Sequence, residues 1–101
     1  MSRDRGTARQ PIDQGYGLVC DLDGRPHPDL ILSDAHQEHG VVTARVGSGA
    51  PLPELATGAR VRILPNHACA TGAQHSSYNA VRSGSNVVVA EWPRFSGWRP
   101  L

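Results

Sequence analysis

The sequence predicts a small all-β domain, built as a β-barrel or sandwich with only short helical turns. Eleven Gly and eight Pro among 101 residues indicate frequent turns and short elements. No segment keeps a 3.6-residue apolar period over several turns, as a long helix would. A chain of this length has room for one domain with a modest core. With one Phe, two Tyr and two Trp, that core must come mostly from Val, Leu, Ile and Ala.

Short extended segments are expected wherever aliphatic or β-branched residues lie between Gly, Pro, Asp or Asn. They are residues 15–22, 30–35, 40–46, 60–65, 78–83 and 86–92. The last two are predicted to form a hairpin across Gly84 and Ser85. The stretch "DGRPHPD" (Asp23–Asp29) is predicted to be a turn. One helical turn is expected at Pro53–Ala56, and Asn66–Ser76 is expected to be irregular or briefly helical.

Residues 1–14 are polar and carry charges of both signs, so they are predicted to be a flexible N-terminal arm ahead of a β-domain at residues 15–101. The start "MSRDRGTARQ" lacks the apolar core of a secretory signal. The longest aliphatic run, Val87–Ala90, is too short to span a bilayer. We therefore expect a cytoplasmic protein with no membrane partner.

All of the basic residues are arginine, and the chain contains no lysine. Ten basic and nine acidic residues leave a formal net charge of +1, and the arginines are scattered along the chain. This balance gives no basis for a nucleic acid or an anionic membrane as partner. Cys20 and Cys69 are predicted to be free thiols or ligands rather than a disulfide, because no export signal precedes them.

The stretch "PNHACAT" (Pro65–Thr71) places two metal-ligand types close together. In an extended segment, His67 and Cys69 would point to the same side and could converge on one ion. Imidazole nitrogen and thiolate sulfur both bind zinc, and two protein ligands would leave positions open for catalysis. A cysteine nucleophile with a histidine base is a second hypothesis, although no third orienting group is marked. In the plainest interpretation, which the spacing alone favours, Cys69 packs as a small apolar residue while Asn66 and His67 hydrogen-bond a turn.

A second group of candidates lies in "DAHQEHG" (Asp34–Gly40), which contains His36, Glu38 and His39. The two histidines are three residues apart, which would place them on one face of a helix but not of a strand. Because the surrounding pattern is β, the segment is expected to be a polar hairpin end or an exposed turn. A member of it could face the same cavity as His67, and no role is assigned to these residues.

Taken together, the strings "SRDRG", "GYGLV", "LSDAHQEHG", "VRILPNHACAT" and "FSGW" resemble the C-terminal domain of the D-serine dehydratase and D-threonine aldolase family. These are fold-type III pyridoxal-phosphate enzymes related to alanine racemase. The resemblance covers nearly the whole chain, from Ser2 to Trp98. Its most specific element is "PNHACAT", placed after a strand and about 25–30 residues past "EHG".

The resemblance implies that His67 and Cys69 bind a divalent metal beside the cofactor. A cysteine at the second position is similar to the zinc-dependent dehydratases, whereas the aldolases more often have an acidic residue with a harder metal. That difference fits the preference of thiolate for zinc. Gln37 stands where the family often has a second acid before Glu38, so no catalytic role is carried onto Gln37.

The resemblance also implies a TIM-like barrel ahead of this domain, which supplies the Schiff-base lysine and the phosphate site for pyridoxal phosphate. Without a lysine this chain cannot hold that cofactor covalently, so it is expected to be inactive alone. The implied partners are a barrel domain in cis or trans and, in the full enzyme, a D-amino acid and a second subunit of a homodimer. The chain is then expected to be a truncated, excised or split piece of such an enzyme.

The implied reaction is β-elimination from a D-amino acid with a β-hydroxyl, where the metal makes the hydroxyl a better leaving group. A D-threonine aldolase would use the same metal for Cα–Cβ cleavage, and the sequence leaves both reactions open. A free-standing, non-catalytic β-domain for metal binding or protein interaction is another hypothesis, and a cysteine-dependent hydrolase is a further one.

A domain separated from its barrel is also expected to expose an apolar face. Trp92, Phe95 and Trp98 are the candidates for that face, since aromatic residues are scarce elsewhere. The equal alternative is that one or both tryptophans close the small core.

Overall fold

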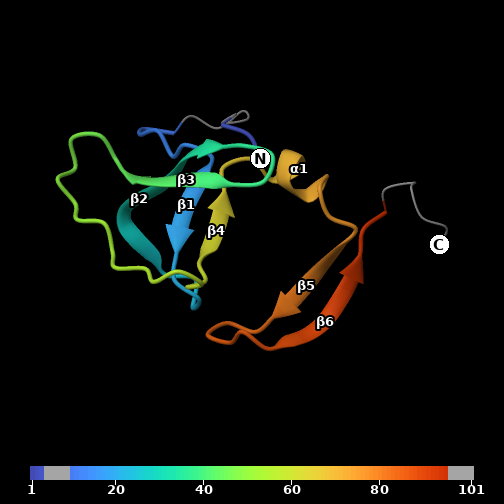
Figure 1. The fold of residues 1–101 in the computed structure, drawn as a ribbon. Coiled ribbons are helices and arrows are strands. Elements are labelled where there is room, and N and C mark those ends of the chain that lie inside the picture. The colour runs from blue at the N-terminus through green and yellow to red at the C-terminus, as the bar shows by residue number, and fades with distance from the viewer. Residues whose placement is uncertain (4–9, 96–101) are drawn as a thin grey trace.

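The computed structural model describes residues 1–3 and 10–95, which form two antiparallel sheets and one short helix (Figure 1). The elements are β1 Gly17–Cys20, β2 Pro26–Ala35, β3 Gly40–Ala44, β4 Arg62–Pro65, α1 Ala68–Gly72, β5 Ser77–Val81 and β6 Val88–Pro93. One sheet has the strand order β3-β2-β1-β4, and the other is the β5-β6 hairpin. The predicted small, mostly-β domain is confirmed, and within the described ranges the sheets do not close into a barrel.

The turn between β1 and β2 is shorter than the sequence predicted. The carboxylate of Asp21 accepts hydrogen bonds from the backbone N–H groups of Asp23 and Arg25, both at 2.9 Å. Gly24 supplies the positive φ of 85° that this turn requires. Strand β2 therefore starts at Pro26, inside the segment expected to be a turn. Proline is compatible with the first residue of a strand because no ladder N–H is needed there.

The core lies in the two central strands of the larger sheet. Its buried side chains are Val19, Cys20, Leu30, Ile31 and Leu32. The three consecutive buried residues in β2 point to alternating faces, so this sheet is covered on both sides at that point. The core is small, as the composition predicted.

Close approach of β1 and β4 depends on a glycine. A Cβ at Gly17 would lie 2.4 Å from the carbonyl oxygen of Leu64, a separation that no side chain tolerates. The pairing of Gly17 with Pro65 in turn holds the end of β4 beside β1. The backbone N–H of Asn66 donates to the carbonyl of Tyr16 at 2.9 Å, which carries this pairing one residue past β4.

The second sheet is the predicted hairpin, which projects away from the four-stranded sheet (Figure 1). Its turn is closed by the N–H of Ser85 donating to the carbonyl of Arg82 at 3.1 Å, with Gly84 at a φ of 73°. The guanidinium of Arg62 on β4 donates to the carbonyl of Ser85 at 3.0 Å and to the side chain of Asn86. This contact ties the hairpin turn to the edge of the larger sheet.

The projecting hairpin makes the molecule elongated. The radius of gyration is 15.1 Å, with extents of 49 × 31 × 25 Å, whereas a compact domain of this length has a radius of about 13 Å. The predicted apolar surface is present on this hairpin and after it: Trp92 is 61% and Phe95 80% exposed. Trp98 lies outside the described residues.

The expected helical turn at Pro53–Ala56 is wrong. That segment is irregular, and the chain makes a turn at Thr57 and Gly58 instead. Leu52 and Leu55 are both exposed, so the segment has no buried apolar face to stabilise a helical turn. The short helix forms in the stretch expected to be irregular or briefly helical. In the described ranges no helix is long and apolar enough to cross a membrane.

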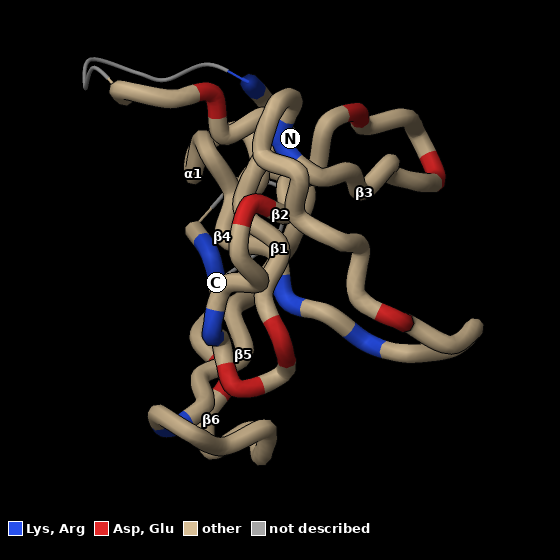
Figure 2. The backbone as a smooth tube through the Cα atoms, turned by 90° about the vertical axis from the view of Figure 1, so that its left-hand side faces the viewer, with Lys and Arg blue, Asp and Glu red and all other residues tan. Residues whose placement is uncertain are grey.

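Part of the predicted N-terminal arm contacts the sheet. The guanidinium of Arg3 donates to the carbonyl of Ser33 at 3.1 Å and pairs with the carboxylate of Asp13 at 2.5 Å. It also lies 5.7 Å from the ring centroid of Tyr16. The domain boundary between residues 14 and 15 stays a prediction. Figure 2 shows the arginines of the described chain interspersed with acidic residues rather than gathered on one element.

Candidate metal centre

The loop that carries His67 is anchored by the residue before it. Besides the backbone bond to Tyr16, the side chain of Asn66 accepts a hydrogen bond from Gln10 Nε2 at 2.7 Å and donates one to the carbonyl of Arg3 at 3.0 Å. Asn66 therefore connects the β4–α1 loop to two other parts of the chain. A loop held in this way can present the next side chain in a defined position.

His67 and Cys69 do not lie on one extended segment, so the condition under which both would point to the same side is not met. His67 is the N-cap residue of α1, with an extended backbone (φ −132°, ψ 113°). Cys69 is the second residue of the helix and is exposed. The backbone changes from extended to helical between them, as is usual at an N-cap. The rule that residues two apart share a side of a strand therefore does not apply here.

The first turn of α1 is closed by local hydrogen bonds. The hydroxyl of Thr71 donates to the carbonyl of His67 at 3.1 Å, and the N–H of Ala73 donates to the carbonyl of Cys69 at 3.0 Å. The helix is only five residues long. It redirects the chain from β4 towards β5 (Figure 1). Cys69, in its first turn, is exposed.

The donor types at this turn suit a soft or borderline metal ion, because imidazole and thiolate both bind zinc well. Within the ranges that the structure describes, no three His, Cys, Asp or Glu side chains come together around a possible ion. Zinc usually takes four ligands. An ion at His67 and Cys69 would therefore need further ligands from water, from a substrate or from another part of a larger protein.

The two thiols differ strongly in their surroundings. Cys20 is fully buried in β1, and burial raises the pKa of its thiol, with the neighbouring Asp21 carboxylate adding to the effect. A buried thiol held in its neutral form is a poor metal ligand and a poor nucleophile. Cys69 is the exposed thiol, which makes it the accessible one of the pair.

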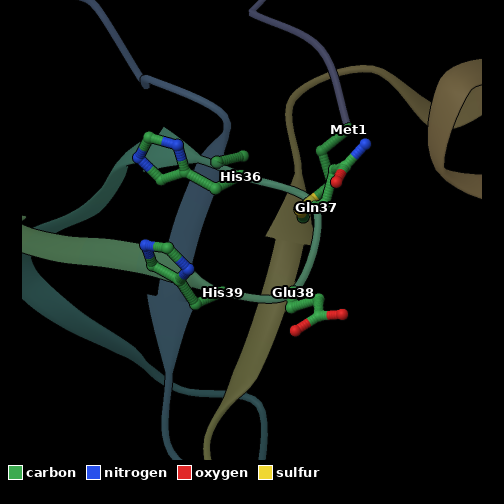
Figure 3. Close-up of a pocket in the computed structure, with 6 residues that line it drawn as sticks. Met1, His36, Gln37, Glu38 and His39 are labelled. Atoms are coloured by element: carbon green, nitrogen blue, oxygen red, sulfur yellow. The ribbon is translucent and has the colours of Figure 1, made fainter.

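The segment with His36 and His39 is a hairpin end, as predicted. The N–H of His36 donates to the carbonyl of His39 at 2.8 Å across the two-residue loop Gln37–Glu38. The two imidazole rings stack with centroids 4.5 Å apart and an interplanar angle of 22°. They line an open hollow together with Met1, Ala35 and the loop, and His67 is not among its lining residues (Figure 3).

Sequence reasoning missed two features of these segments. It compared His36 and His39 only as residues of a helix or of a single strand. Residues three apart that flank a two-residue hairpin loop form a cross-strand pair. This spacing could have predicted that the two histidines face each other. It also assigned Asn66 only to a turn, whereas its side chain joins the loop to Gln10 and Arg3.

Comparison with known proteins identifies the family of the chain. The family described as a serine dehydratase domain matches residues 1–81. The chain is 52% identical over 102 residues to D-threo-3-hydroxyaspartate dehydratase from Delftia sp. strain HT23, which covers 97% of this chain and 26% of that enzyme. The chain thus spans about a quarter of the length of this relative.

Solved structures agree with this assignment. The Delftia enzyme superposes with a TM-score of 0.71, again over 97% of this chain and 26% of the enzyme. Its structure is also known for a cysteine-to-alanine variant in the metal-free form, at 50% identity, the same coverage and a TM-score of 0.71. An alanine racemase-like protein from Idiomarina loihiensis, 39% identical, gives a TM-score of 0.63 over 97% of this chain and 25% of that protein. The chain belongs to the serine dehydratase domain family, the family that its motifs resemble.

Proposed function

We propose that the chain is the metal-bearing β-domain of a pyridoxal-phosphate-dependent lyase that removes water from a D-3-hydroxy amino acid. Identity of 52% to D-threo-3-hydroxyaspartate dehydratase over nearly the whole chain supports this class of reaction. Because the chain spans 26% of that enzyme, the rest of the catalytic machinery belongs to a further domain, in cis or in trans.

The observation that carries the proposal is the order and spacing of His67 and Cys69. Two variants of the Delftia enzyme replace a histidine and, two residues later, a cysteine, and a structure of the cysteine variant is known in the metal-free form. His67 and Cys69 have the same order and the same spacing in this chain. We therefore assign them as ligands of a divalent metal. Zinc is the metal that a thiolate and an imidazole favour over magnesium or manganese.

A bound zinc ion would supply Lewis acidity, which stabilises negative charge on a departing hydroxyl oxygen. The residues of this chain hold the two metal ligands in place. Asn66 fixes the loop before His67 through its bonds to Gln10 and Arg3, and the first turn of α1 presents the thiol of Cys69 at the surface. With two protein ligands, the remaining coordination positions stay available to water and substrate.

Pyridoxal phosphate does not fit this chain by itself. Covalent attachment needs a lysine amine, and the chain contains no lysine. A barrel domain that holds the cofactor is therefore part of the proposal, as is a homodimer of the complete enzyme. No step of the reaction on the cofactor is assigned to residues of this chain.

Aldol cleavage and a non-catalytic role are the competing functions. A cysteine rather than a carboxylate in the second ligand position favours a dehydratase over a D-threonine aldolase, because thiolate selects the softer metal. The exposed apolar side chains of the β5–β6 hairpin favour a domain that packs against a partner over one that functions alone.

The direct test is the zinc content of the purified chain, measured by elemental analysis after dialysis. We expect His67→Ala and Cys69→Ala each to hold less zinc per chain than the wild type, because each variant loses the ion at this site. His75→Ala and Cys20→Ala are the matched controls, since each removes the same side chain elsewhere, and both should keep the metal. Equal zinc in all five proteins would contradict the assignment of the ligands.

A chimera tests the function itself. This chain would replace the corresponding quarter of the Delftia dehydratase, which 52% identity makes feasible. We expect elimination from D-threo-3-hydroxyaspartate to give oxaloacetate and ammonia. Loss of either ligand should lower turnover by about a hundredfold or more, because a metal that stabilises a leaving oxygen contributes several kcal/mol. Release of glycine and an aldehyde from D-threonine, with no elimination product, would identify an aldolase instead.

A further inference from the structure

The hairpin between β2 and β3 places two imidazoles side by side at the surface. His36 and His39 flank the loop Gln37–Glu38 and face each other across the hairpin, because Ala35 pairs with Gly40 just beyond them. Figure 3 shows both rings on the same side of the hairpin, while the carboxylate of Glu38 points away from them. The histidines are thus a cross-strand pair on one face.

The backbone holds this pair together before any ligand arrives. The His36 N–H donates to the His39 carbonyl at 2.8 Å, which fixes the spacing of the two Cα atoms. The ring centroids are 4.5 Å apart. Two nitrogens that bind one ion at about 2.1 Å each need to be about 3 Å apart. Since ring nitrogens lie off the centroid and both side chains are exposed, a tilt of the rings brings one nitrogen of each to that spacing.

We propose that His36 and His39 form a second metal site, a two-imidazole chelate for a borderline divalent ion such as Ni²⁺, Cu²⁺ or Zn²⁺. Imidazole is a ligand that suits these ions, whereas magnesium and calcium prefer oxygen. Two nitrogens in a fixed pair bind more tightly than one, because the second contact is intramolecular. The site is separate from His67 and Cys69, and its remaining coordination positions are open to water.

The experiment isolates the pair from the other candidate site. In a chain carrying His67→Ala and Cys69→Ala, Ni²⁺ binding is measured by calorimetric titration at neutral pH. His36→Ala, His39→Ala and the double variant are then made in this background. His75→Ala is the matched control, since it removes an exposed imidazole with no second imidazole stacked on it in the described part of the chain. Circular dichroism checks that each variant is folded.

We expect the background chain to bind one Ni²⁺, and each single variant of the pair to lower the affinity by about tenfold or more. The double variant should bind most weakly of all, because each single variant still holds one imidazole that binds the ion through a single nitrogen. His75→Ala should leave the affinity unchanged. The proposal is overturned if either single variant binds as the background does, or if His75→Ala weakens binding equally.

Discussion

The four-stranded sheet and the β5–β6 hairpin both contain aliphatic side chains, but the sheet buries them and the hairpin exposes them. In the sheet, the aliphatic side chains of β1 and β2 are buried, and Leu30 is only 1% exposed. In the hairpin, Val88 is 52% exposed and Trp92 is 61% exposed. The sheet therefore supplies its own core, whereas the apolar residues of the hairpin have little cover among the described residues.

The hairpin has the two-faced pattern of a sheet that packs against something. The hydroxyl of Ser77 donates to the carboxylate of Glu91 at 2.6 Å, which marks one face as polar. Tyr78 and Trp92 are cross-strand partners and, by alternation, lie on the other face. A face that gathers apolar side chains in this way is typical of strands with one buried side. Because an isolated two-stranded hairpin is marginal in water, the exposed apolar residues of this hairpin support the proposal that it packs against a further domain.

The largest contrast is expected in stability. Leu30→Ala removes a fully buried side chain and should lower the free energy of unfolding by about 2–5 kcal/mol. Val88→Ala removes a similar side chain from the hairpin and should change it by no more than about 0.5 kcal/mol. Urea unfolding of the two variants and the wild type measures both values. A similar large loss in both would mean that the hairpin belongs to the same cooperative core.

The next contrast concerns association. The apolar face of the hairpin should make the isolated chain self-associate, and Trp92→Ser should weaken the association by about tenfold or more, since buried tryptophans dominate interfaces. Val46→Ser is the control, because Val46 is fully exposed in a loop. Static light scattering over a wide range of concentration gives the mass. A wild-type chain that stays monomeric throughout would contradict this expectation.

The smallest expected effect is a pH dependence of stability that arises from Cys20 in the four-stranded sheet. Burial raises the pKa of the Cys20 thiol in the folded state, so the folded protein keeps the proton that the unfolded chain releases. The contribution of Cys20 to stability is then complete below the ordinary thiol pKa of about 8.5 and is lost as the pH rises through the folded value. The urea concentration at the midpoint of unfolding should decrease as the pH is raised from about 8 to about 10. The decrease should be smaller in Cys20→Ala. An equal fall in that variant would remove Cys20 as the cause.

Much of the fold could be predicted because local signals and tertiary structure agree in most strands. Alternation and flanking Gly or Pro located the strands and the β5–β6 hairpin correctly. The start of β2 was missed because Pro26 was taken as a breaker, although a proline in the first position of a strand breaks no ladder bond. The helical turn expected at Pro53–Ala56 does not form, because a turn of helix needs a buried face, which local sequence does not reveal.

The candidate site was less predictable than the fold. The residue types of His67 and Cys69 indicated metal chemistry, but their geometry depends on a change from extended to helical backbone at one residue. The anchoring of Asn66 joins residues more than fifty positions apart in the sequence, so no local pattern contains it. His36 and His39 face each other because only two residues separate them in the hairpin loop, and the sequence analysis did not use that loop length.

The elongated shape has a consequence for how this chain diffuses. A monomer with extents of 49 × 31 × 25 Å experiences more friction than a sphere of equal mass. It will therefore leave a gel-filtration column earlier than a compact standard and can be mistaken for a dimer. If the hairpin folded back onto the sheet, or if a covering domain enclosed it, the frictional ratio would fall even as the mass stayed the same or rose. The sedimentation coefficient combined with a measured mass therefore reports directly on whether the hairpin is extended.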